Sequence, residues 1–483
     1  MKADFEKKNL TKKSENIAAW YNDLVLLADL ADYAETRGCM IIKPWGYAIW
    51  ESVQDILDKQ FKSDGIKNVY FPALIPKSLF KKEKEHIEGF APELLSIDSI
   101  GKEKLKDPYV LRPTSEAVID KSLAKWIKSY RDLPFKINQW CNVFRAEKRT
   151  YPFLRTTEFL WQEAHTSFAS EKECQEMTLK ASKWYQDFYE QYFAIAPYAG
   201  LKSQSEKFAG AKNTYTIEMV APNGKALQLG TSHNLSNNFS KVFDIQFLDK
   251  NGKKQYVYQN SFGLSTRAIG GLVLTHGDDW GLILPPKIAP LQVIILPIVK
   301  NEALDNEIIN FSKVIFDKLV SCNIRADIDL DFKHTLGYRI NDWELKGVPL
   351  RIEIGQKELK EKQLLTVRRD NFEKNKLNIN NFQQNISKIL SEIQNDLFER
   401  SKSQRNNLST NADSYEEFKK AIAEGKFVRA FWCENEKCES LIKEETKATN
   451  RCLEFEEIEK TTNGKCVYCG KKANRRWLFA KSY

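Results

Sequence analysis

The chain has little of what membrane and secreted proteins need. Its longest apolar run, around residues 291–299 of 483, is too short to span a bilayer. The amino-terminal stretch MKADFEKKNLTKKSEN contains no apolar segment of the kind that a signal peptide has. We therefore expect a cytoplasmic protein that has no membrane-spanning segment.

Cysteine is scarce over most of the chain, yet five of the nine cysteines fall in the last 51 residues. In a reducing compartment, such crowding favours a metal site over disulfides. Two pairs, Cys433 with Cys438 and Cys466 with Cys469, have the spacing of turns that together wrap one tetrahedral zinc ion. We expect these four thiolates to bind a structural Zn²⁺, and we leave Cys452 unassigned.

Charge of one sign is not in large excess. The 74 Lys and Arg residues against 65 Asp and Glu residues give a net charge of +9. That balance permits a polyanionic partner without requiring one. The length predicts two to four domains, each with its own core.

Residues 141–168, CNVFRAEKRTYPFLRTTEFLWQEAHTSF, predict two strands joined by a cationic loop, with Pro152 as the turn signal. Arg145 and Glu147 share one face of the first strand. The residues that share a face of the second are Phe159, Trp161, Glu163 and His165. Such a face is too polar for a core and too apolar for a free surface. It suits a pocket for a small zwitterion beside a polyphosphate.

This stretch resembles the motif 2 hairpin of class II aminoacyl-tRNA synthetases, and RTYPFLRTTEFLWQEAHT is similar to the version in prolyl-tRNA synthetases. Residues 46–76, a long helix and a strand with Pro72 at its centre, resemble motif 1, which forms the dimer interface in the family. Residues 261–276, SFGLSTRAIGGLVLTH, resemble motif 3, with Arg267 at a strand–helix junction. The phrases RGCMIIKPWGYAIWE (37–51), HIEGFAPE (86–93) and LRPTSEAVI (111–119) are also similar to the prolyl enzymes.

The resemblance is to prolyl-tRNA synthetases of the archaeal and eukaryotic type, over nearly the whole chain. Fewer than 100 residues separate the hairpin from motif 3, too few for the editing domain inserted there in the bacterial type. The chain also has the extra C-terminal domain and ends in Tyr483. In the family this terminal segment folds back towards the active site.

The resemblance implies a multidomain fold of α/β and α+β parts. We expect a class II catalytic domain on an antiparallel sheet over 1–284, an α/β anticodon-binding domain over 285–400 and a small zinc-binding domain over 413–483. Alternating strand-like and helical runs beyond residue 290 predict a mixed sheet. The stretches 284–290 and 401–412 are predicted linkers.

Local patterns predict several boundaries. Helical spacing covers residues 14–33 and 170–193, and a second helix runs from Pro44 to a stop at Gly65. A strand is expected over 68–76, and Ser115 with Glu116 predicts a helix start. Further helix signals are the capping box of Ser414 with Glu417 and the stop at Gly425.

In the family, the carboxylate of proline attacks the α-phosphate of ATP, and the terminal ribose hydroxyl of tRNA(Pro) then takes the prolyl group. Because the first nucleophile is already ionised, catalysis rests on positioning and charge neutralisation. By position the catalytic residues are Arg145 and Arg267, and Mg²⁺ bridges the phosphates. The resemblance also implies a homodimer.

The resemblance assigns the other site residues by position. For L-proline they are Thr114, Glu116, Arg145, Trp161, Glu163, His165, Phe208 and His233. For ATP they are Arg145, Glu147, Arg155, Thr156, Gln228, Thr231, Thr266 and Arg267. For the tRNA anticodon they are Glu344, Lys346, Arg351 and Glu353, just before a phrase that departs from the family pattern. Taken singly, each has a structural alternative, such as helix capping or a solvated charged surface.

Three other functions stay open at this point. Another class II synthetase, such as a threonyl or histidyl enzyme, would differ in the amino acid that supports ATP–pyrophosphate exchange. A synthetase-like regulator would bind tRNA or an amino acid without charging, and its mark would be the loss of a motif arginine, yet Arg145 and Arg267 are present. A zinc-ribbon nucleic-acid binder would explain only the last domain.

Overall fold

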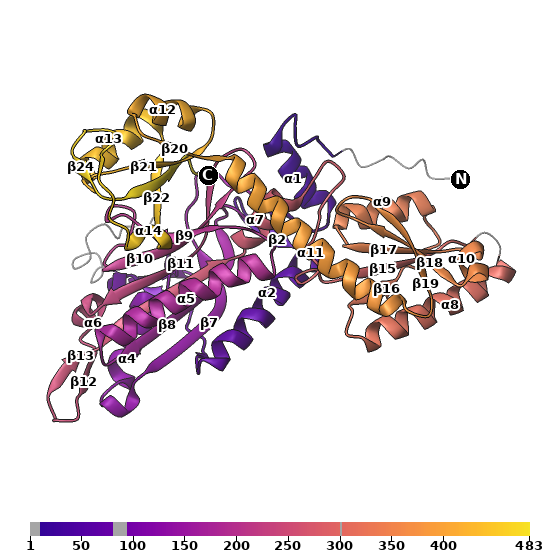
Figure 1. Ribbon diagram of the computed structural model, residues 1–483. Helices are drawn as coiled ribbons and strands as arrows, with labels where there is room; N and C mark the ends of the chain where they lie inside the picture. The colour runs from indigo at the N-terminus through magenta and orange to yellow at the C-terminus, as the bar shows by residue number, and fades with distance from the viewer. Residues whose placement is uncertain (1–9, 81–93, 300–301) are drawn as a thin grey trace.

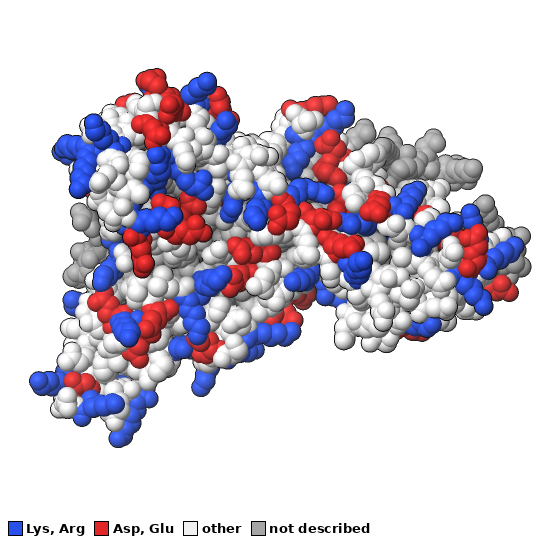
Figure 2. Space-filling view, in the orientation of Figure 1, with Lys and Arg blue, Asp and Glu red and all other residues white. Residues whose placement is uncertain are grey.

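The computed structural model describes residues 10–80, 94–299 and 302–483, so the phrase at 86–93 lies outside the described residues. Figure 1 shows a central body with the C-terminal domain on one side and an α/β domain on the other. Among the described helices, none is both long and apolar enough for a membrane span. On the face shown in Figure 2, acidic and basic side chains are interspersed over all three parts.

The first helix is shorter than predicted. α1 (Ile17–Leu27) begins after Asn16, whose side chain caps it, and it ends where Asp29 takes a φ of +57°. The remainder of the predicted helix forms β1 (Ala31–Tyr33), which pairs with β2 (Met40–Ile42). The sequence pattern missed this end because apolar residues continue at helical spacing across the turn.

The second helix, α2 (Pro44–Ser63), agrees with its prediction: a proline stands at its first position and Gly65, at φ +79°, follows its end. The strand expected over 68–76 is divided into β3 (Lys67–Asn68) and β4 (Leu74–Pro76). Pro72 lies in the break and has no backbone N–H to donate to a ladder.

An almost wholly antiparallel sheet forms the central body. In spatial order its strands are β9 (Tyr198–Leu201), β10 (Asn213–Val220), β11 (Ala226–Ser236), β14 (Tyr258–Ser265), β8 (Glu158–Phe168), β7 (Phe135–Phe144) and β3. β7 and β8 are the predicted hairpin, but β7 ends at Phe144. Arg145 and Glu147 therefore lie just beyond the strand, in the connection.

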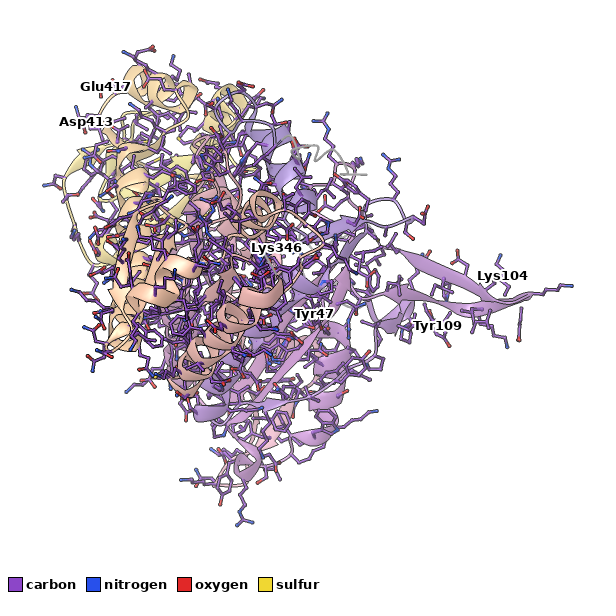
Figure 3. All side chains as sticks on the ribbon, turned by 90° about the vertical axis from the view of Figure 1, so that its right-hand side faces the viewer. Tyr47, Lys104, Tyr109, Lys346, Asp413 and Glu417 are labelled. Atoms are coloured by element: carbon purple, nitrogen blue, oxygen red, sulfur yellow. The ribbon has the colours of Figure 1, made fainter. Side chains whose placement is uncertain are left out.

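Helices pack on this sheet. α5 (Glu171–Gln191) packs along β11 and β14, and α7 (Arg267–His276) follows β14 directly, as predicted for motif 3. The remaining elements of this body are α4 (Glu116–Trp126), η1 (Tyr130–Asp132), α6 (Asn238–Phe243), β12 (Gln246–Leu248) and β13 (Lys254–Tyr256). A separate sheet of β4, β6 (Glu103–Leu111) and β5 (Ser96–Ile100) projects outward, with Lys104 near its tip (Figure 3).

The predicted mixed sheet of the α/β domain is confirmed. Its spatial order is β16 (Ala326–Ile328), β15 (Val293–Pro297), β17 (Leu350–Ile354), β18 (Gln363–Arg368) and β19 (Lys374–Asn378). The first three strands are parallel, and the last two pairings are antiparallel. Its helices are α8 (Glu302–Ser321), α9 (Leu336–Lys346), α10 (Gln356–Glu361) and α11 (Phe382–Asn407).

Neither predicted linker is a free connection. Residues 284–290 have no regular structure, but Leu284, Ile288 and Ala289 are fully buried in the main core. The prediction for 401–412 is wrong, because α11 continues to Asn407 and β20 (Ser409–Ala412) follows. The polar side chains there bond the central body: the Ser401 hydroxyl accepts from the Ala196 N–H at 3.1 Å, and Arg405 donates to the Pro197 carbonyl at 2.9 Å.

The C-terminal domain extends the central sheet. Its elements after β20 are α12 (Tyr415–Ala423), β21 (Phe427–Phe431), α13 (Glu436–Thr446), β22 (Thr449–Glu454), α14 (Phe455–Ile458), β23 (Gly464–Lys465), β24 (Lys472–Ala473) and β25 (Arg476–Ala480). The Ser414 capping box and the stop at Gly425 are confirmed. Because β22 pairs with β9, strands β20, β21, β25 and β22 join the catalytic strands in one 11-stranded sheet.

Candidate active site and metal centre

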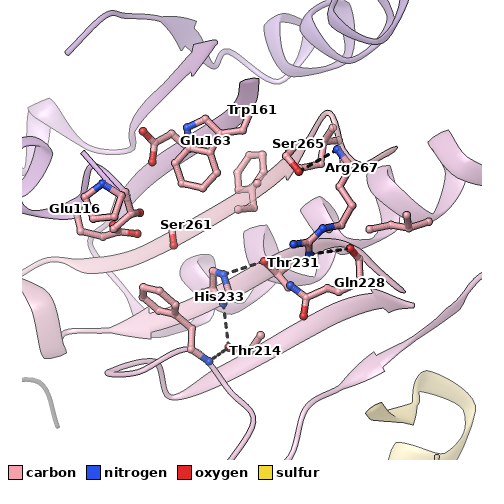
Figure 4. A pocket seen from close by; sticks show the side chains of 18 of the residues that line it. Glu116, Trp161, Glu163, Thr214, Gln228, Thr231, His233, Ser261, Ser265 and Arg267 are labelled. Atoms are coloured by element: carbon pink, nitrogen blue, oxygen red, sulfur yellow. Dashed lines mark hydrogen bonds between the residues drawn. The ribbon is translucent and has the colours of Figure 1, made fainter. Parts of the chain in front are cut away.

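A pocket of about 550 Å³ opens on the central sheet (Figure 4). Strands β8, β11 and β14 supply its floor, while the start of α4 and the loop between β9 and β10 supply its sides. Many of the residues expected from the sequence line it together. They are Thr114, Glu116, Arg145, Trp161, Glu163, His165, Phe208, Gln228, Thr231, His233 and Arg267.

One end of the pocket is acidic and buried. Glu116 is 5% exposed and accepts a hydrogen bond from the Thr114 hydroxyl. Burial, followed by the charge of Glu163, raises the pKa of Glu116 against the opposing effect of His165. α4 does begin at Glu116, as predicted, but the Ser115 hydroxyl donates to Glu163 instead of capping the helix.

His165 lies between carboxylates on the floor of this end. Its Nε2 is 3.6 Å from Glu163 Oε2. Burial opposes the imidazolium, but Glu163, Glu116 and Asp120 together raise the pKa of His165. The cluster therefore favours a positive charge among its carboxylates.

Three buried polar atoms at this end have no hydrogen-bond partner among the described residues: Glu163 Oε2, His165 Nε2 and Ser261 Oγ. All three residues line the pocket. Buried polar groups are nearly always paired in native proteins. Glu163 Oε2 and His165 Nε2 have only their 3.6 Å ion pair with each other. Donor and acceptor atoms that face one cavity without hydrogen bonds are suited to a small polar ligand that carries a cationic N–H group.

Aromatic and neutral groups form the opposite wall. The ring centroids of Phe208 and His233 are 4.7 Å apart. The two ring nitrogens of His233 lie 3.0 Å from the hydroxyls of Thr214 and Thr231 (Figure 4). Burial, with Lys202 nearby, lowers the pKa of His233 to about 3, so its imidazole is neutral. This wall suits an apolar ring.

Arginines gather at the other end. The Arg145 guanidinium lies 5.3 Å from the Phe159 ring centroid and 5.7 Å from that of Trp161. Arg267 donates to the Leu154 carbonyl at 3.0 Å. Burial, then the charges of Arg145 and Arg155, lowers the pKa of Arg267 to about 10. Cations that destabilise one another in this way are stabilised by a bound polyanion.

Four residues predicted for ATP do not line the pocket. Glu147 and Arg155 form an ion pair of 2.7 Å with each other in the β7–β8 connection. Thr156 and Thr266 are buried, and their hydroxyls have no partner among the described residues.

Residues that the sequence analysis missed include Ser261 and three members of the loop between β9 and β10, which are Lys202, Glu206 and Lys207. Asp120 was also missed. It is buried beneath the acidic end, where it accepts from the Gln259 amide at 2.6 Å. A usable signal was the charged string KSQSEK between two strands rich in apolar residues.

The anticodon candidates divide into two groups. Arg351 bonds Glu344 at 2.7 Å and Glu353 at 2.9 Å, which places these three together on β17 and α9. Lys346 points elsewhere, with its ammonium group 2.8 Å from Asp342 and 3.7 Å from Asp29 of the central body.

The four cysteines predicted as metal ligands come together. The ligand atoms of Cys433, Cys438, Cys466 and Cys469 lie within 4.8 Å of one another. Cys433 Sγ is 3.6 Å from Cys438 Sγ and 3.7 Å from Cys469 Sγ. Tetrahedral bonds of about 2.3 Å to zinc separate sulfur atoms by about 3.8 Å, so the cluster has the size of a Zn–Cys₄ site. Cys452 is buried in β22, outside the cluster.

Three family models match the chain in succession. Residues 99–276 match the tRNA synthetase class II core domain (G, H, P, S and T), residues 292–389 match an anticodon binding domain, and residues 415–483 match the prolyl-tRNA synthetase C-terminal domain. A proline–tRNA ligase of Symbiobacterium thermophilum is 47% identical over 99% of this chain and 98% of its own length. Proline–tRNA ligase 2 of Clostridioides difficile is 45% identical over 98% of each chain, and the ligase of Borreliella burgdorferi is 46% identical over 98% of this chain and 99% of its own.

Proposed function

Because this chain belongs to the prolyl-tRNA synthetases that carry the family's C-terminal domain, and is a proline–tRNA ligase, we propose that the pocket on its central sheet is where L-proline and ATP react. The observation that carries this proposal is that acidic and basic side chains occupy opposite ends of the same cavity. Acid and imidazole atoms without hydrogen bonds stand at one end, and arginines at the other.

The acidic end binds the imino group of proline. A protonated secondary amine has two N–H donors, and Glu116, Glu163 and the Thr114 hydroxyl offer acceptors within one lined space. The rings of Trp161, Phe208 and His233 enclose the pyrrolidine, with His165 beneath it. The carboxylates offset the positive charge favoured on His165, and a neutral His233 adds no further cation beside the proline ammonium.

The arginine end binds the nucleotide. Arg145 lies between the two ends and offers a planar fork to the proline carboxylate and the α-phosphate. Arg267 and Arg155 neutralise the outer phosphates, while Gln228, Thr231 and Glu147 lie towards the nucleoside. Thr156 and Thr266, which the resemblance also assigns to ATP, lie buried beside this end, and their hydroxyls are left to bond the nucleotide. No side chain has to be deprotonated to act as nucleophile, so these residues act by orientation and charge stabilisation.

Two metal ions belong to this proposal. Mg²⁺ arrives with the triphosphate and offsets its charge. Zn²⁺ is bound by Cys433, Cys438, Cys466 and Cys469 and has a structural role, because four thiolates leave no open coordination position.

The remaining assignments concern the whole protein. We propose a catalytic domain over 1–284, an anticodon-binding domain over 285–400 and a zinc-binding domain over 413–483. Glu344, Arg351, Glu353 and Lys346 are the candidate anticodon readers. A homodimer through the motif 1 region and a cytoplasmic location complete the proposal. Light scattering of the pure protein tests the dimer.

The decisive experiment for the pocket is proline-dependent ATP–pyrophosphate exchange by Arg145→Ala. We expect kcat/KM to fall at least about 1,000-fold, as it does when a transition-state charge contact is removed. The matched control is Arg131→Ala, an exposed arginine whose guanidinium lies over the ring of Tyr130, and it should exchange like the unaltered protein. Undiminished exchange by a folded Arg145→Ala protein would refute the assignment.

A further inference from the structure

The loop between β9 and β10, residues 202–208, forms one wall of the pocket. Lys202, Glu206, Lys207 and Phe208 line the cavity from it. The backbone of the loop is bonded at both ends: the Lys202 N–H donates to the Thr214 carbonyl at 2.8 Å, and the Phe208 N–H donates to the Thr214 hydroxyl at 3.0 Å. Between these ends, side chains of residues 203–206 are bonded from outside the central body.

Helix α13 of the C-terminal domain makes that outside contact. Glu439 is 5% exposed, and its carboxylate accepts from the Ser203 hydroxyl at 2.8 Å and, through its other oxygen, from the Ser205 hydroxyl. One helical turn further on, the Lys443 ammonium is 3.4 Å from Glu206. A buried carboxylate with both oxygens bonded to one loop restrains that loop strongly, because losing either bond leaves a desolvated charge.

A second contact between the C-terminal domain and the central body involves β22. Arg451 donates to Glu218 on β10 at 2.7 Å, and the other oxygen of Glu218 is 3.4 Å from the Lys202 ammonium. All three side chains are at most 6% exposed. The C-terminal domain thus contacts Ser203, Ser205 and Glu206 of the lining segment directly, and it reaches Lys202 only through Glu218 of β10.

Glu439 directly follows Cys438, one of the four clustered cysteines, at the start of α13. A metal bound by these thiolates would hold the first turn of the helix against the turn that carries Cys466 and Cys469. We propose that Glu439 is a positioning residue for proline: it transmits the fixed geometry of the metal centre to the 202–208 wall, so that the C-terminal domain sets the affinity for the amino acid more than for ATP.

This inference rests on the proposed proline pocket, because Phe208 of the same loop packs on His233 at the end assigned to the amino acid. The nucleotide end, around Arg145 and Arg267, has no contact with Glu439 among the bonds of the described residues. The two substrates should therefore respond differently when the Glu439 contact is removed.

The test uses the full-length, zinc-loaded protein with Glu439→Ala. We expect the proline Kd, measured by equilibrium dialysis, and the proline KM in pyrophosphate exchange to rise about 10-fold, which corresponds to about 1.4 kcal/mol. The ATP KM should stay within about twofold, and elemental analysis should still find one zinc per chain. Glu439→Gln, which keeps one acceptor oxygen, should recover part of the affinity.

The matched control is Glu445→Ala in the same helix. The Glu445 carboxylate also accepts from two hydroxyls, those of Tyr415 at 2.7 Å and Tyr468 at 3.0 Å, but both lie within the C-terminal domain. This variant should leave the Kd for proline within about twofold. An equal effect of Glu445→Ala would mean that general loosening of the domain is responsible, and the proposal would be wrong.

Ser205→Ala tests the same contact from the loop side and leaves the C-terminal domain intact. It should raise the Kd for proline about threefold alone, but add nothing in the Glu439→Ala background, because the shared bond is already gone. Additive effects, an unchanged Kd in Glu439→Ala, or equal rises in the proline and ATP KM values would overturn the proposal. If the pocket assignment itself is wrong, Arg145→Ala will show undiminished exchange. The outcomes above can therefore be distinguished from failure of the proposed function.

Discussion

The charge of Asp120, beneath the acidic end of the pocket, is poorly compensated by hydrogen bonds. It is 1% exposed, one of its oxygens has no partner among the described residues, and the other is bonded only to Gln259. Burial, together with the charge of Glu116, raises the pKa of Asp120 to about 7, although His165 acts in the opposite direction. The folded protein therefore binds a proton here more tightly than the unfolded chain does between about pH 4 and pH 7.

This shift predicts a pH-dependent effect of Asp120→Asn. Stability from Asp120 is present at low pH and is lost as pH rises through 7, because only the folded state favours the proton. The unaltered protein should lose about 2–3 kcal/mol of this contribution to its unfolding free energy between pH 5 and pH 8. Asparagine cannot ionise, so Asp120→Asn should not show this loss, and its stability relative to the unaltered protein should rise by the same amount. Urea titrations at both pH values measure it, and a difference independent of pH would contradict the assignment.

The pocket walls also predict a limit to selectivity. Trp161, Phe208 and His233 enclose an apolar ring, and each methylene that is missing from a substrate costs roughly 1–3 kcal/mol. Alanine and cysteine should therefore support exchange with kcat/KM lower than for proline by about two to four orders of magnitude, yet above background. Exchange that is undetectable with either amino acid would show that the enzyme excludes them by something other than the apolar contacts of these walls.

At the scale of elements, the junction of β9 with β22 joins the catalytic strands to the C-terminal domain. A Cβ atom on Gly200 would overlap the Leu453 carbonyl oxygen, which is backbone and cannot rotate away. The close approach of the two strands therefore requires glycine at this position.

Gly200→Ala should separate β22 from β9 and lower the free energy of unfolding by about 1–3 kcal/mol, as overpacking does. Gly337→Ala in α9 is the control, since a Cβ there meets no atom within 4 Å. Alanine is the better helix former, so the control should be neutral or more stable by up to about 1 kcal/mol. Urea unfolding of the two variants compares them, and equal losses of stability would contradict this account.

At the scale of the whole molecule, the C-terminal residue Tyr483 and helix α1 both lie near the β7–β8 connection. The Tyr483 N–H donates to the Ala226 carbonyl at 3.2 Å, and Lys225 lies over its ring. Burial, with Tyr151 of the β7–β8 connection nearby, raises the pKa of Tyr483 to about 12. From α1, the Tyr21 hydroxyl donates to the Pro152 carbonyl at 2.7 Å.

Deleting Tyr483 should reduce exchange activity about 10-fold while circular dichroism and zinc content stay unchanged. The physical reason is the loss of a partly buried ring that packs on the main core, close to Tyr151 of the connection that also carries Arg155 and Glu147. A truncated protein with full activity would show that the terminus is a surface tail.

The whole-molecule arrangement also bears on proofreading. The segment between β8 and β14 forms α5, strands β9–β13 and α6 of the central body. We expect that the pure protein does not deacylate alanyl-tRNA(Pro). Release of alanine faster than uncatalysed hydrolysis would contradict this expectation.

Much of the site was accessible to sequence reasoning because strands impose a period of two residues. Phe159, Trp161, Glu163 and His165 all line the pocket, as their alternation along one strand predicts. The four-cysteine cluster was accessible because paired turns constrain ligand spacing. Helices with clear start and stop residues were also predicted well, as the helix between Pro44 and Gly65 shows.

The errors have a common cause in long-range contacts. The polar stretch 401–412 looks like a linker because its serines and arginines find their partners about 200 residues away, on Ala196 and Pro197. Lys202 and Glu439 were missed for the same reason, since neither has a local pattern that distinguishes it from a surface charge.

Local patterns were sufficient for the hairpin face, the motif order and the metal-binding cysteines, because strand alternation, helix capping and ligand spacing act between residues that are close along the chain. The three-dimensional arrangement was required to reveal that the C-terminal strands extend the catalytic sheet, and that Glu439 and Arg451 support the pocket wall. Such contacts depend on which buried groups meet after the chain has folded, and a buried charge is paired wherever packing brings a partner, however far away it lies in the sequence.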